Sequence, residues 1–259
     1  MSYANCELRV VILIISFLRP QYLSQCLEAV SRVKIPIKVY LVNQGDKSEQ
    51  MKKIVSYWSS KLSLVYKENR GVEGISNMKR WGMESMKVDG LEYCVILDDD
   101  VLLIKDGLEK LVETADKYKD YHTIAGFLIE RGILKLMVGG FIWKEKDFIT
   151  YPRDKYSEGF HQVEWAGGGF TIHRLEPLVL HDPAYIIGLE DFDYSFELKK
   201  LGLKIGVTGD AGAYHKILVD KNGHFTKYEN TSYNNFRMER KRLQPSFDRF
   251  KEKWGIKVK

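Results

Sequence analysis

Three consecutive aspartates, Asp98, Asp99 and Asp100, follow the apolar run of residues 92–97. Carboxylates packed this closely repel one another, and a bound divalent cation removes that repulsion. Their hard oxygen atoms suit Mg²⁺ or Mn²⁺, which commonly also bind the phosphates of a substrate. The alternative is a solvated acidic loop that begins the next helix. The place of the triplet at the end of an apolar strand favours the metal site.

A second acidic pair, Glu190 and Asp191, lies at the start of the segment EDFDYSFELKKL. Acids in the first turn of a helix are favoured by the helix dipole, so this pair could serve the helix alone. The chemical alternative is that Asp191 acts as a general base, which needs a carboxylate beside the proton that it removes. The residues by themselves leave both interpretations open.

Two further segments contain candidate ligand-binding groups. His215 follows Tyr214, and although a single histidine is more often structural, the aspartate triplet makes it a candidate metal ligand. The loop NRGVEGISN, residues 69–77, contains glycines that would let the backbone approach a ligand before a helix begins. That loop matches neither the Walker phosphate-binding loop nor a full G-x-G-x-x-G motif.

Strand and helix patterns alternate four times in about the first 110 residues. Strands are expected at residues 9–16, 37–43, 62–67 and 92–97, and helices at residues 20–33, 46–58, 74–86 and 106–118. This alternation predicts βαβ units and a parallel sheet covered by helices. Because such sheets bind ligands beyond the carboxyl ends of their strands, residues 17–20, 43–46, 68–71 and 98–100 form the predicted binding edge.

The second half of the chain has a less regular pattern. Two strand-like runs are expected within residues 122–143, a loop at 144–164, a helix at 190–201, short strands at 204–215, and a charged helix at 231–254 that Pro245 breaks. We expect one domain over residues 1–259. Its first half, which contains the predicted binding edge, would span about 1–120, its second half about 121–230 and a helical segment about 231–259.

The overall composition is typical of a globular protein, with 44% hydrophobic and 29% charged residues. A net charge of +5 suits an anionic substrate such as a nucleotide but falls short of the dense basic patch of a nucleic-acid binder. Cys6, Cys26 and Cys94 are widely spaced, which predicts reduced thiols rather than disulfides or a zinc site. The apolar run of residues 10–18 is too short to span a bilayer. We expect a cytoplasmic protein, with peripheral membrane association left open.

Taken in order, these motifs resemble those of the family 2 glycosyltransferases over about residues 9–215. The matching segments are VVILIISFLRP (10–20), VNQGDKSE (42–49), ENRGVEGISN (68–77), the D-x-D motif DDD (98–100), WAGGGF (165–170), LEDFD (189–193) and His215. The resemblance implies an α/β architecture of the GT-A type. Such a fold has a Rossmann-like, mostly parallel central sheet flanked by helices, and a smaller mixed or antiparallel sheet on the acceptor side.

The resemblance also implies roles for individual residues. Asp100 and His215 would bind Mn²⁺ or Mg²⁺ together with Asp98, and Asp191 would be the base of an inverting reaction. The implied donor-binding residues are Ser16, Phe17, Arg19, Asn43, Gly45, Asn69, Gly74, Asn77, Asp98 and Asp99. The residues implied near the acceptor or the donor sugar are Trp165, Gly168, Gly169 and Glu190. Residues 144–164 would form a lid that orders when the donor binds.

The expected activity is therefore metal-dependent transfer of a sugar from a nucleotide sugar, such as a UDP-sugar, to an acceptor hydroxyl. The acceptor could be a glycan, a lipid-linked sugar, a protein or a metabolite, with modified DNA less favoured. One alternative is a nucleotidyltransferase on a similar sheet, although residues 17–20 lack the glycine-rich basic loop of that class. The other is a binding module without catalysis, which the presence of both acidic motifs disfavours.

Overall fold

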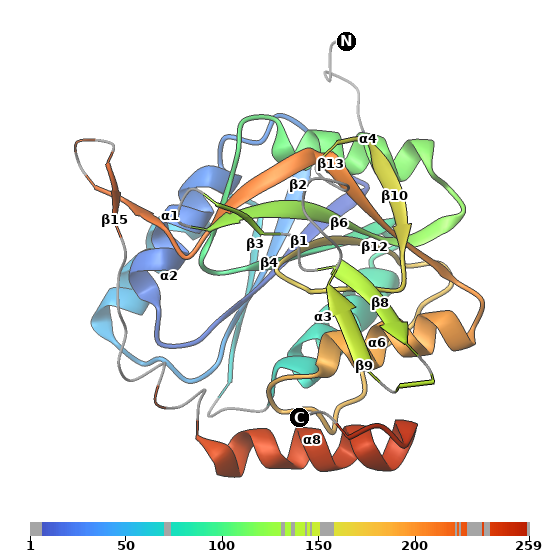
Figure 1. The fold of residues 1–259 in the computed structure, drawn as a ribbon. Helices are drawn as coiled ribbons and strands as arrows, with labels where there is room; N and C mark the ends of the chain where they lie inside the picture. The colour runs from blue at the N-terminus through green and yellow to red at the C-terminus, as the bar shows by residue number, and fades with distance from the viewer. Residues whose placement is uncertain are drawn as a thin grey trace.

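The computed structural model describes residues 7–69, 74–130, 133–135, 138–142, 144–145, 147–150, 158–220, 222, 224–226, 235 and 239–257. A ten-stranded sheet forms its centre, with helices on both faces (Figure 1). The strands in this sheet are β1 (Val10–Ser16), β2 (Ile37–Asn43), β3 (Leu64–Glu68), β4 (Tyr93–Asp98), β5 (Val101–Leu103), β6 (Tyr121–Glu130), β7 (Ile133–Lys135), β10 (Phe160–Val163), β12 (Phe170–Arg174) and β13 (Lys204–His215). The helices are α1 (Pro20–Val30), α2 (Glu49–Ser59), α3 (Ile75–Val88), α4 (Gly107–Lys117), α6 (Glu190–Lys200) and α8 (Arg240–Trp254).

The first four strands pair in parallel in the order β4-β1-β2-β3. Ser16 aligns with Asn43, and Ile15 aligns with Asp98, so the carboxyl ends of these strands lie level with one another. The predicted binding edge is therefore present. The apolar, β-branched sequence of β1 suits this central position because both of its faces are covered.

Alternate residues of β1 point into two separate hydrophobic cores. Ile12 packs in the core beneath α1, α2 and α4, whereas Leu13 packs in the core beneath α3 and α6. Each helix contributes residues at helical spacing, such as Leu23 and Leu27 of α1. The four helices expected in the first half are confirmed, and together they fix the loops that follow the strands.

Beyond β4 the sheet becomes mixed. Strand β12 lies between β4 and β6 and is antiparallel to both, while β13 runs parallel to β6 and β10 forms the edge. A second, antiparallel sheet contains β11 (Trp165–Ala166), β8 (Val138–Ile142) and β9 (Asp147–Thr150). A third pair joins β14 (Leu218–Val219) to β15 (Phe225–Thr226). The α/β class with a smaller antiparallel sheet is thus confirmed.

Two expectations for the second half were wrong. Residues 144–164 were expected to be loop but include β9 and β10, although residues 151–157 lie outside the described part. Strand β10 forms because it pairs with β13 and because Phe160 stacks on Tyr118 with ring centroids 3.7 Å apart, contacts that no local pattern encodes. Residues 204–215 form one strand with an irregular register rather than several short ones.

The predicted break at Pro245 was also wrong, because α8 continues through this residue. Proline removes one backbone hydrogen bond, and the helix is held elsewhere by packing. Ser246 and Phe250 are buried, and the ring of Phe250 packs against Phe196 of α6. Of residues 231–238, which were expected to belong to the same helix, only residue 235 lies in the described part.

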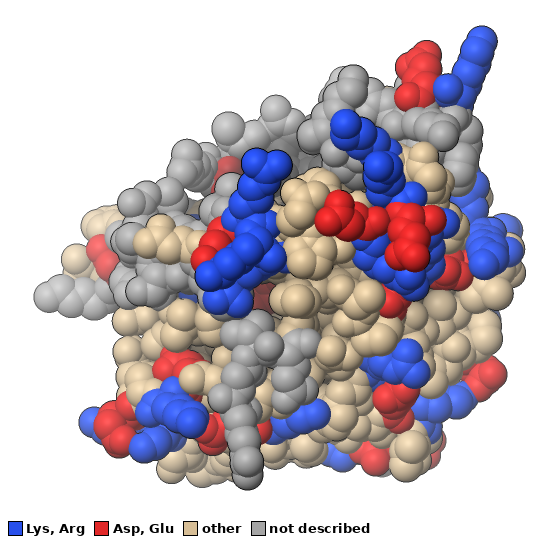
Figure 2. Space-filling model, turned by 90° about the horizontal axis from the view of Figure 1, so that it is seen from below, with Lys and Arg blue, Asp and Glu red and all other residues tan. Residues whose placement is uncertain are grey.

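Helix α8 closes one side of the molecule and lies against α6 (Figure 1). Several of its basic side chains are engaged with acidic ones, as in Lys253 with Asp193 and Arg249 with Asp182. The face seen from below carries basic and acidic residues side by side rather than one basic field (Figure 2). Helix α8 therefore covers α6 with its apolar side and pairs much of its charge within the fold.

Two features of the chain bear on its environment. Cys26 and Cys94 are buried free thiols, as expected, whereas Cys6 lies outside the described residues. Among the helices of the described residues, none is both long enough and apolar enough to cross a membrane.

Candidate functional site

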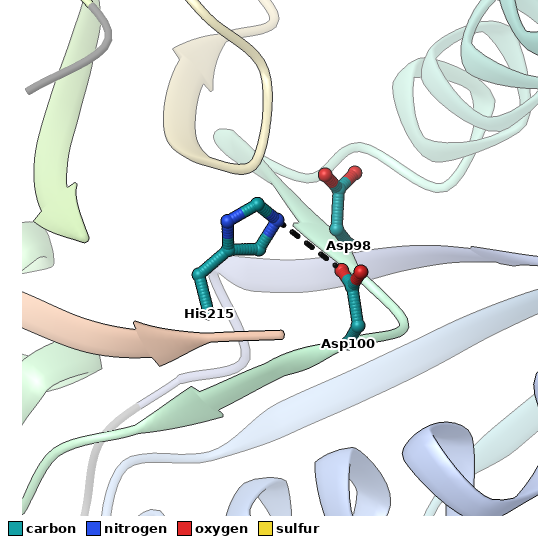
Figure 3. A group of neighbouring side chains, drawn as sticks. All are labelled: Asp98, Asp100 and His215. Atoms are coloured by element: carbon teal, nitrogen blue, oxygen red, sulfur yellow. Dashed lines mark ion pairs between the residues drawn. The ribbon is translucent and has the colours of Figure 1, made fainter. Parts of the chain in front are cut away.

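Three predicted metal ligands meet at the carboxyl edge of the sheet. Asp98 ends β4, Asp100 lies in the turn before β5, and His215 ends β13. Because β5 pairs with β13 so that Val101 faces His215, the histidine is brought next to the aspartate turn. One ligand atom from each of the three side chains lies within 4.8 Å of the others, and the side chains point toward a common centre (Figure 3).

The donor set fits a divalent cation. Asp100 is 2% exposed, and its Oδ1 atom has no hydrogen-bond partner among the described residues. The Nε2 atom of His215 lies 3.5 Å from this oxygen, and the Nδ1 atom of the same ring lies 3.6 Å from Oε2 of Glu130. A carboxylate behind a histidine ligand orients the ring toward a metal, which is a common arrangement in metal sites. Two carboxylates and an imidazole are suitable ligands for Mn²⁺ or Mg²⁺.

Arg19 lies against the aspartate turn from the loop after β1. Its guanidinium donates hydrogen bonds to both Asp99 and Asp100. Burial raises the pKa of Asp99 to about 7 even though Arg19 contacts it. Burial acts in the same direction on Asp100, but Arg19 and His215 outweigh it and hold the pKa of Asp100 below its usual range. The turn therefore already places Asp100 as a carboxylate, the form that binds a cation.

Asp191 lies in the first turn of α6, and both of its carboxylate oxygens are held. Its Oδ1 atom accepts a hydrogen bond from Nζ of Lys79 at 2.6 Å, and its Oδ2 atom accepts one from the backbone N–H of Gly168 at 2.8 Å. Lys79 also lies 3.6 Å from Glu190. Although burial disfavours its charged form, the neighbouring carboxylates of Asp191 and Glu190 hold the pKa of Lys79 above its usual range.

The metal ligands and Asp191 line the same cavity, which has a volume of about 300 Å³. Predicted site residues in its wall are Arg19, Asp98, Asp100, Gly168, Gly169, Glu190, Asp191 and His215. Gly168 and Gly169 lie between the metal ligands and Asp191 in the cavity wall. A Cβ atom on Gly168 would lie 2.7 Å from Oδ1 of Asp191, and one on Gly169 would lie 3.2 Å from Oδ2 of Asp98. The consecutive glycines therefore let both carboxylates approach the backbone.

Other predicted donor-binding residues lie around this edge without lining that cavity. Asn43 is buried, and its side chain donates hydrogen bonds to the Asp46 carbonyl and the Tyr66 hydroxyl, so it shapes the loop after β2. The side chain of Asn69 contacts the sulfur of Met78. The remaining members of this group are Ser16 at the end of β1, Phe17 after it, Gly45 after β2, Gly74 and Asn77 at the start of α3, and Asp99 in the aspartate turn.

Trp165, which the sequence places near the acceptor, is 6% exposed and packs against Phe192 with ring centroids 4.6 Å apart. It also lies outside the cavity wall. In this position its ring packs against α6.

Sequence reasoning missed three residues of the site. Lys79 is 1% exposed and shares the buried face of α3 with Met83 and Met86. A lysine spaced with core residues on a helix is unusual, and this spacing could have identified Lys79 from the sequence. Glu130 and Lys216 had no such signal. Glu130 reaches His215 only because β6 and β13 are neighbours, and Lys216 lines the cavity with a positive φ of 55°.

Solved structures with a similar fold share little sequence with this chain. TarS 1–349 of S. aureus with UDP-GlcNAc has a TM-score of 0.65 and 12% identity, and the match covers 97% of this chain and 68% of TarS. GalNAc-T7 with UDP, GalNAc and Mn²⁺ has a TM-score of 0.62 and 16% identity, covering 82% of this chain and 44% of that one. The mannosyltransferase PcManGT from Pyrobaculum calidifontis with GDP-Man and Mn²⁺ has a TM-score of 0.57 and 16% identity, covering 83% and 58%.

In another structure of TarS 1–349, the match spans 60% of that chain's length. These similarities confirm the GT-A fold expected from the sequence. No curated protein sequence matches the chain significantly.

The family itself is identified by sequence. Residues 11–173, more than half of the chain, match the model of glycosyl transferase family 2. The matched region begins in β1 and ends in β12, so it includes the aspartate triplet and the glycines beside Asp191. This protein therefore belongs to glycosyl transferase family 2.

Proposed function

We propose that this protein transfers a sugar from a nucleotide sugar to an acceptor hydroxyl in a metal-dependent reaction that inverts the anomeric centre. One observation carries the proposal. The metal-ligand cluster and Asp191 line one cavity and lie against the consecutive glycines Gly168 and Gly169. A candidate site for a diphosphate and a candidate base thereby share one cavity.

The metal ligands and Asp191 would act on opposite ends of the reaction, the leaving group and the acceptor. A divalent cation held by Asp98, Asp100 and His215 would neutralise the charge that grows on the departing nucleoside diphosphate. Asp191 accepts the proton of the acceptor hydroxyl while that oxygen bonds to the anomeric carbon. The bond from this carbon to the phosphate oxygen breaks in the same displacement, so the configuration inverts and the nucleoside diphosphate leaves.

We further propose a uridine diphosphate sugar as the donor. The similar structures of TarS and GalNAc-T7 contain UDP or UDP-GlcNAc, and that of PcManGT contains GDP-Man, so a GDP-sugar is the competing donor. Arg19 and Lys216 add positive charge to the cavity wall beside the metal ligands, where the diphosphate of either donor would lie. The acceptor-side residues are Glu190, Asp191 and the loop that contains Gly188.

The test is a release assay with UDP-glucose, UDP-GlcNAc, UDP-galactose and GDP-mannose, each with Mn²⁺, Mg²⁺ or EDTA. We expect steady, metal-dependent release of nucleoside diphosphate from a UDP-sugar. Pyrophosphate release from a nucleoside triphosphate and a sugar phosphate would instead identify a nucleotidyltransferase, and binding without turnover would identify a binding module.

The Asp191→Ala variant tests the base. Because a positioned base contributes roughly 10²–10⁴-fold, the rate should fall by about 100-fold or more. Calorimetric binding of UDP with Mn²⁺ should be unchanged, since Asp191 lies apart from the metal ligands. Full activity in this variant would overturn the assignment of the base.

A further inference from the structure

Lys79 is a charged side chain in an unusual place. It lies on α3 and is 1% exposed, yet its ammonium group reaches the wall of the cavity. A buried ammonium is costly unless it is paired, and this one lies 2.6 Å from Oδ1 of Asp191 and 3.6 Å from Oε1 of Glu190. The protein thus stabilises a buried positive charge directly beside the candidate base.

The contacts of Lys79 leave Asp191 little rotational freedom. The lysine holds Oδ1, and the N–H of Gly168 holds Oδ2 from another element. The fit is close, since a Cβ atom on Gly168 would lie 2.7 Å from Oδ1 of Asp191 and 2.9 Å from Nζ of Lys79. The carboxylate is therefore fixed by two donors from α3 and the loop before β12.

The charges around the pair come from several elements. Glu190 and Asp191 of α6 and Asp98 of β4 are the acidic groups that act on Lys79. The imidazoles of His173 and His181 lie nearby, and burial lowers the pKa of each well below its usual value, so neither adds positive charge at neutral pH. Lys79 is thus the cation that offsets the acidic end of α6 within this cluster.

We propose that Lys79 is the positioning residue of the base, holding the carboxylate of Asp191 aimed into the cavity while the acceptor binds. This inference rests on the proposed function. In the reaction the acceptor proton moves to Asp191 as the new carbon–oxygen bond forms, and Lys79 keeps its own proton. Once Asp191 is neutral, Glu190 still balances the ammonium charge, so proton uptake leaves no buried cation without a counter-charge.

The first test compares Lys79→Met and Lys79→Arg with the wild type, using the best UDP-sugar of the release assay. In Lys79→Met, kcat should fall by about 100-fold, the scale of a misplaced catalytic group, while calorimetric binding of UDP with Mn²⁺ stays unchanged. Lys79→Arg should recover part of the rate.

Lys87→Met is the matched control. Lys87 lies on the same helix, pairs with Glu176 and is 39% exposed at the surface. Its replacement should leave kcat as in the wild type.

A double-mutant cycle shows whether Lys79 acts through Asp191. In an Asp191→Asn background, Lys79→Met should lower the rate by less than twofold, and added methylammonium should restore part of the rate of Lys79→Ala only when Asp191 is present. If Lys79→Met releases nucleoside diphosphate at the wild-type rate, or if it lowers the rate equally in both backgrounds, the proposed role of Lys79 is overturned while the proposed function stands. Absence of metal-dependent release by the wild type would instead overturn the proposed function.

Discussion

Each carboxylate oxygen of Asp100 has its own neighbour. Arg19 donates a hydrogen bond to Oδ2, and the imidazole of His215 lies near Oδ1. A cation that binds the folded chain raises the free energy of unfolding by RT ln(1 + [L]/Kd), which is about 2.7 kcal/mol when the cation is at 100 times its Kd. We expect Mn²⁺ to raise the melting temperature of the wild type, and EDTA to reverse the rise. Asp100→Asn should remove most of the effect.

Asp106→Asn is the control for this measurement. Asp106 pairs with Lys34 on the surface and lies outside the cluster of metal ligands. Its replacement should leave the Mn²⁺-induced rise in melting temperature intact. An equal rise in Asp100→Asn and the wild type, measured by differential scanning fluorimetry, would contradict the proposed ligand.

Gly168 offers a second test on a single residue. A methyl group there would press on the carboxylate of Asp191 and the ammonium of Lys79, so Gly168→Ala should lower the release rate on the order of 100-fold. Gly90→Ala meets no atom within 4 Å, and its φ of 73° should cost only about 1 kcal/mol of stability with activity retained. Steady-state kinetics and urea unfolding of both variants separate the two effects.

Single residues also show what the sequence could predict. The aspartate triplet was singled out because three acids are unusual at the end of an apolar strand, and His215 became a candidate ligand because of the triplet. The structure places Asp98, Asp100 and His215 together. Lys79 and Glu130 were not identified, because a lysine in a helix and a glutamate in a strand are ordinary until neighbouring elements are known. Their roles depend on side chains that come from distant parts of the sequence.

Among elements, α6 and α8 form a unit that supports the base. Asp193, two residues after Asp191, is 1% exposed and accepts hydrogen bonds from Tyr185, Trp254 and Lys253. Asp193→Ala removes the acceptor of the Tyr185 hydroxyl and of the Trp254 N–H, whereas Lys253 keeps Asp182 and Glu197. Because unsatisfied buried donors cost free energy, we expect a loss of about 3 kcal/mol in the free energy of unfolding.

Urea unfolding of Asp193→Ala, followed by tryptophan fluorescence, measures this loss. Glu252→Ala removes a carboxylate from the exposed side of the same helix and should change stability by less than about 0.5 kcal/mol. Equal stability of the two variants would show that the contacts between α6 and α8 contribute little.

The elements of the parallel half were predictable because each has its own periodicity and both faces of its strands are apolar. Strand β10 and the continuation of α8 through Pro245 were not, since both depend on contacts across the fold. Tyr118 and β13 hold β10, and Phe196 holds α8 around its proline. A local sequence pattern cannot predict contacts with residues that are distant in the sequence.

For the molecule as a whole, three buried histidines predict acid sensitivity. Burial lowers the pKa of His122, His173 and His181 below the ordinary value, so the folded state binds fewer protons than the unfolded chain. The contribution of these three histidines to stability is therefore full above about pH 6.5 and is lost as the pH falls from there toward the lower folded pKa values. Together the three groups should lower the free energy of unfolding by up to roughly 4 kcal/mol per pH unit.

Urea titrations at pH 7.5, 6.5 and 5.5 would measure this slope. His181, which stacks on Tyr194, is a suitable group to remove, and His181→Phe should reduce the slope by about one histidine's contribution. A slope that stays near zero through this range would rule out the predicted proton linkage. His224→Gln, at an exposed position, is the control.

The order of the strands in the central sheet determines how much of the chain must be synthesised before the candidate site is complete. A nascent chain leaving the ribosome exposes Asp98 and Asp100 early, whereas β12 must still insert between β4 and β6, and β13 must still pair with β5 to deliver His215. Asp191 also emerges late, on α6. A partly translated polypeptide thus has an acidic turn but neither the proposed histidine ligand nor the proposed base, so the proposed reaction must wait until residues up to His215 have folded.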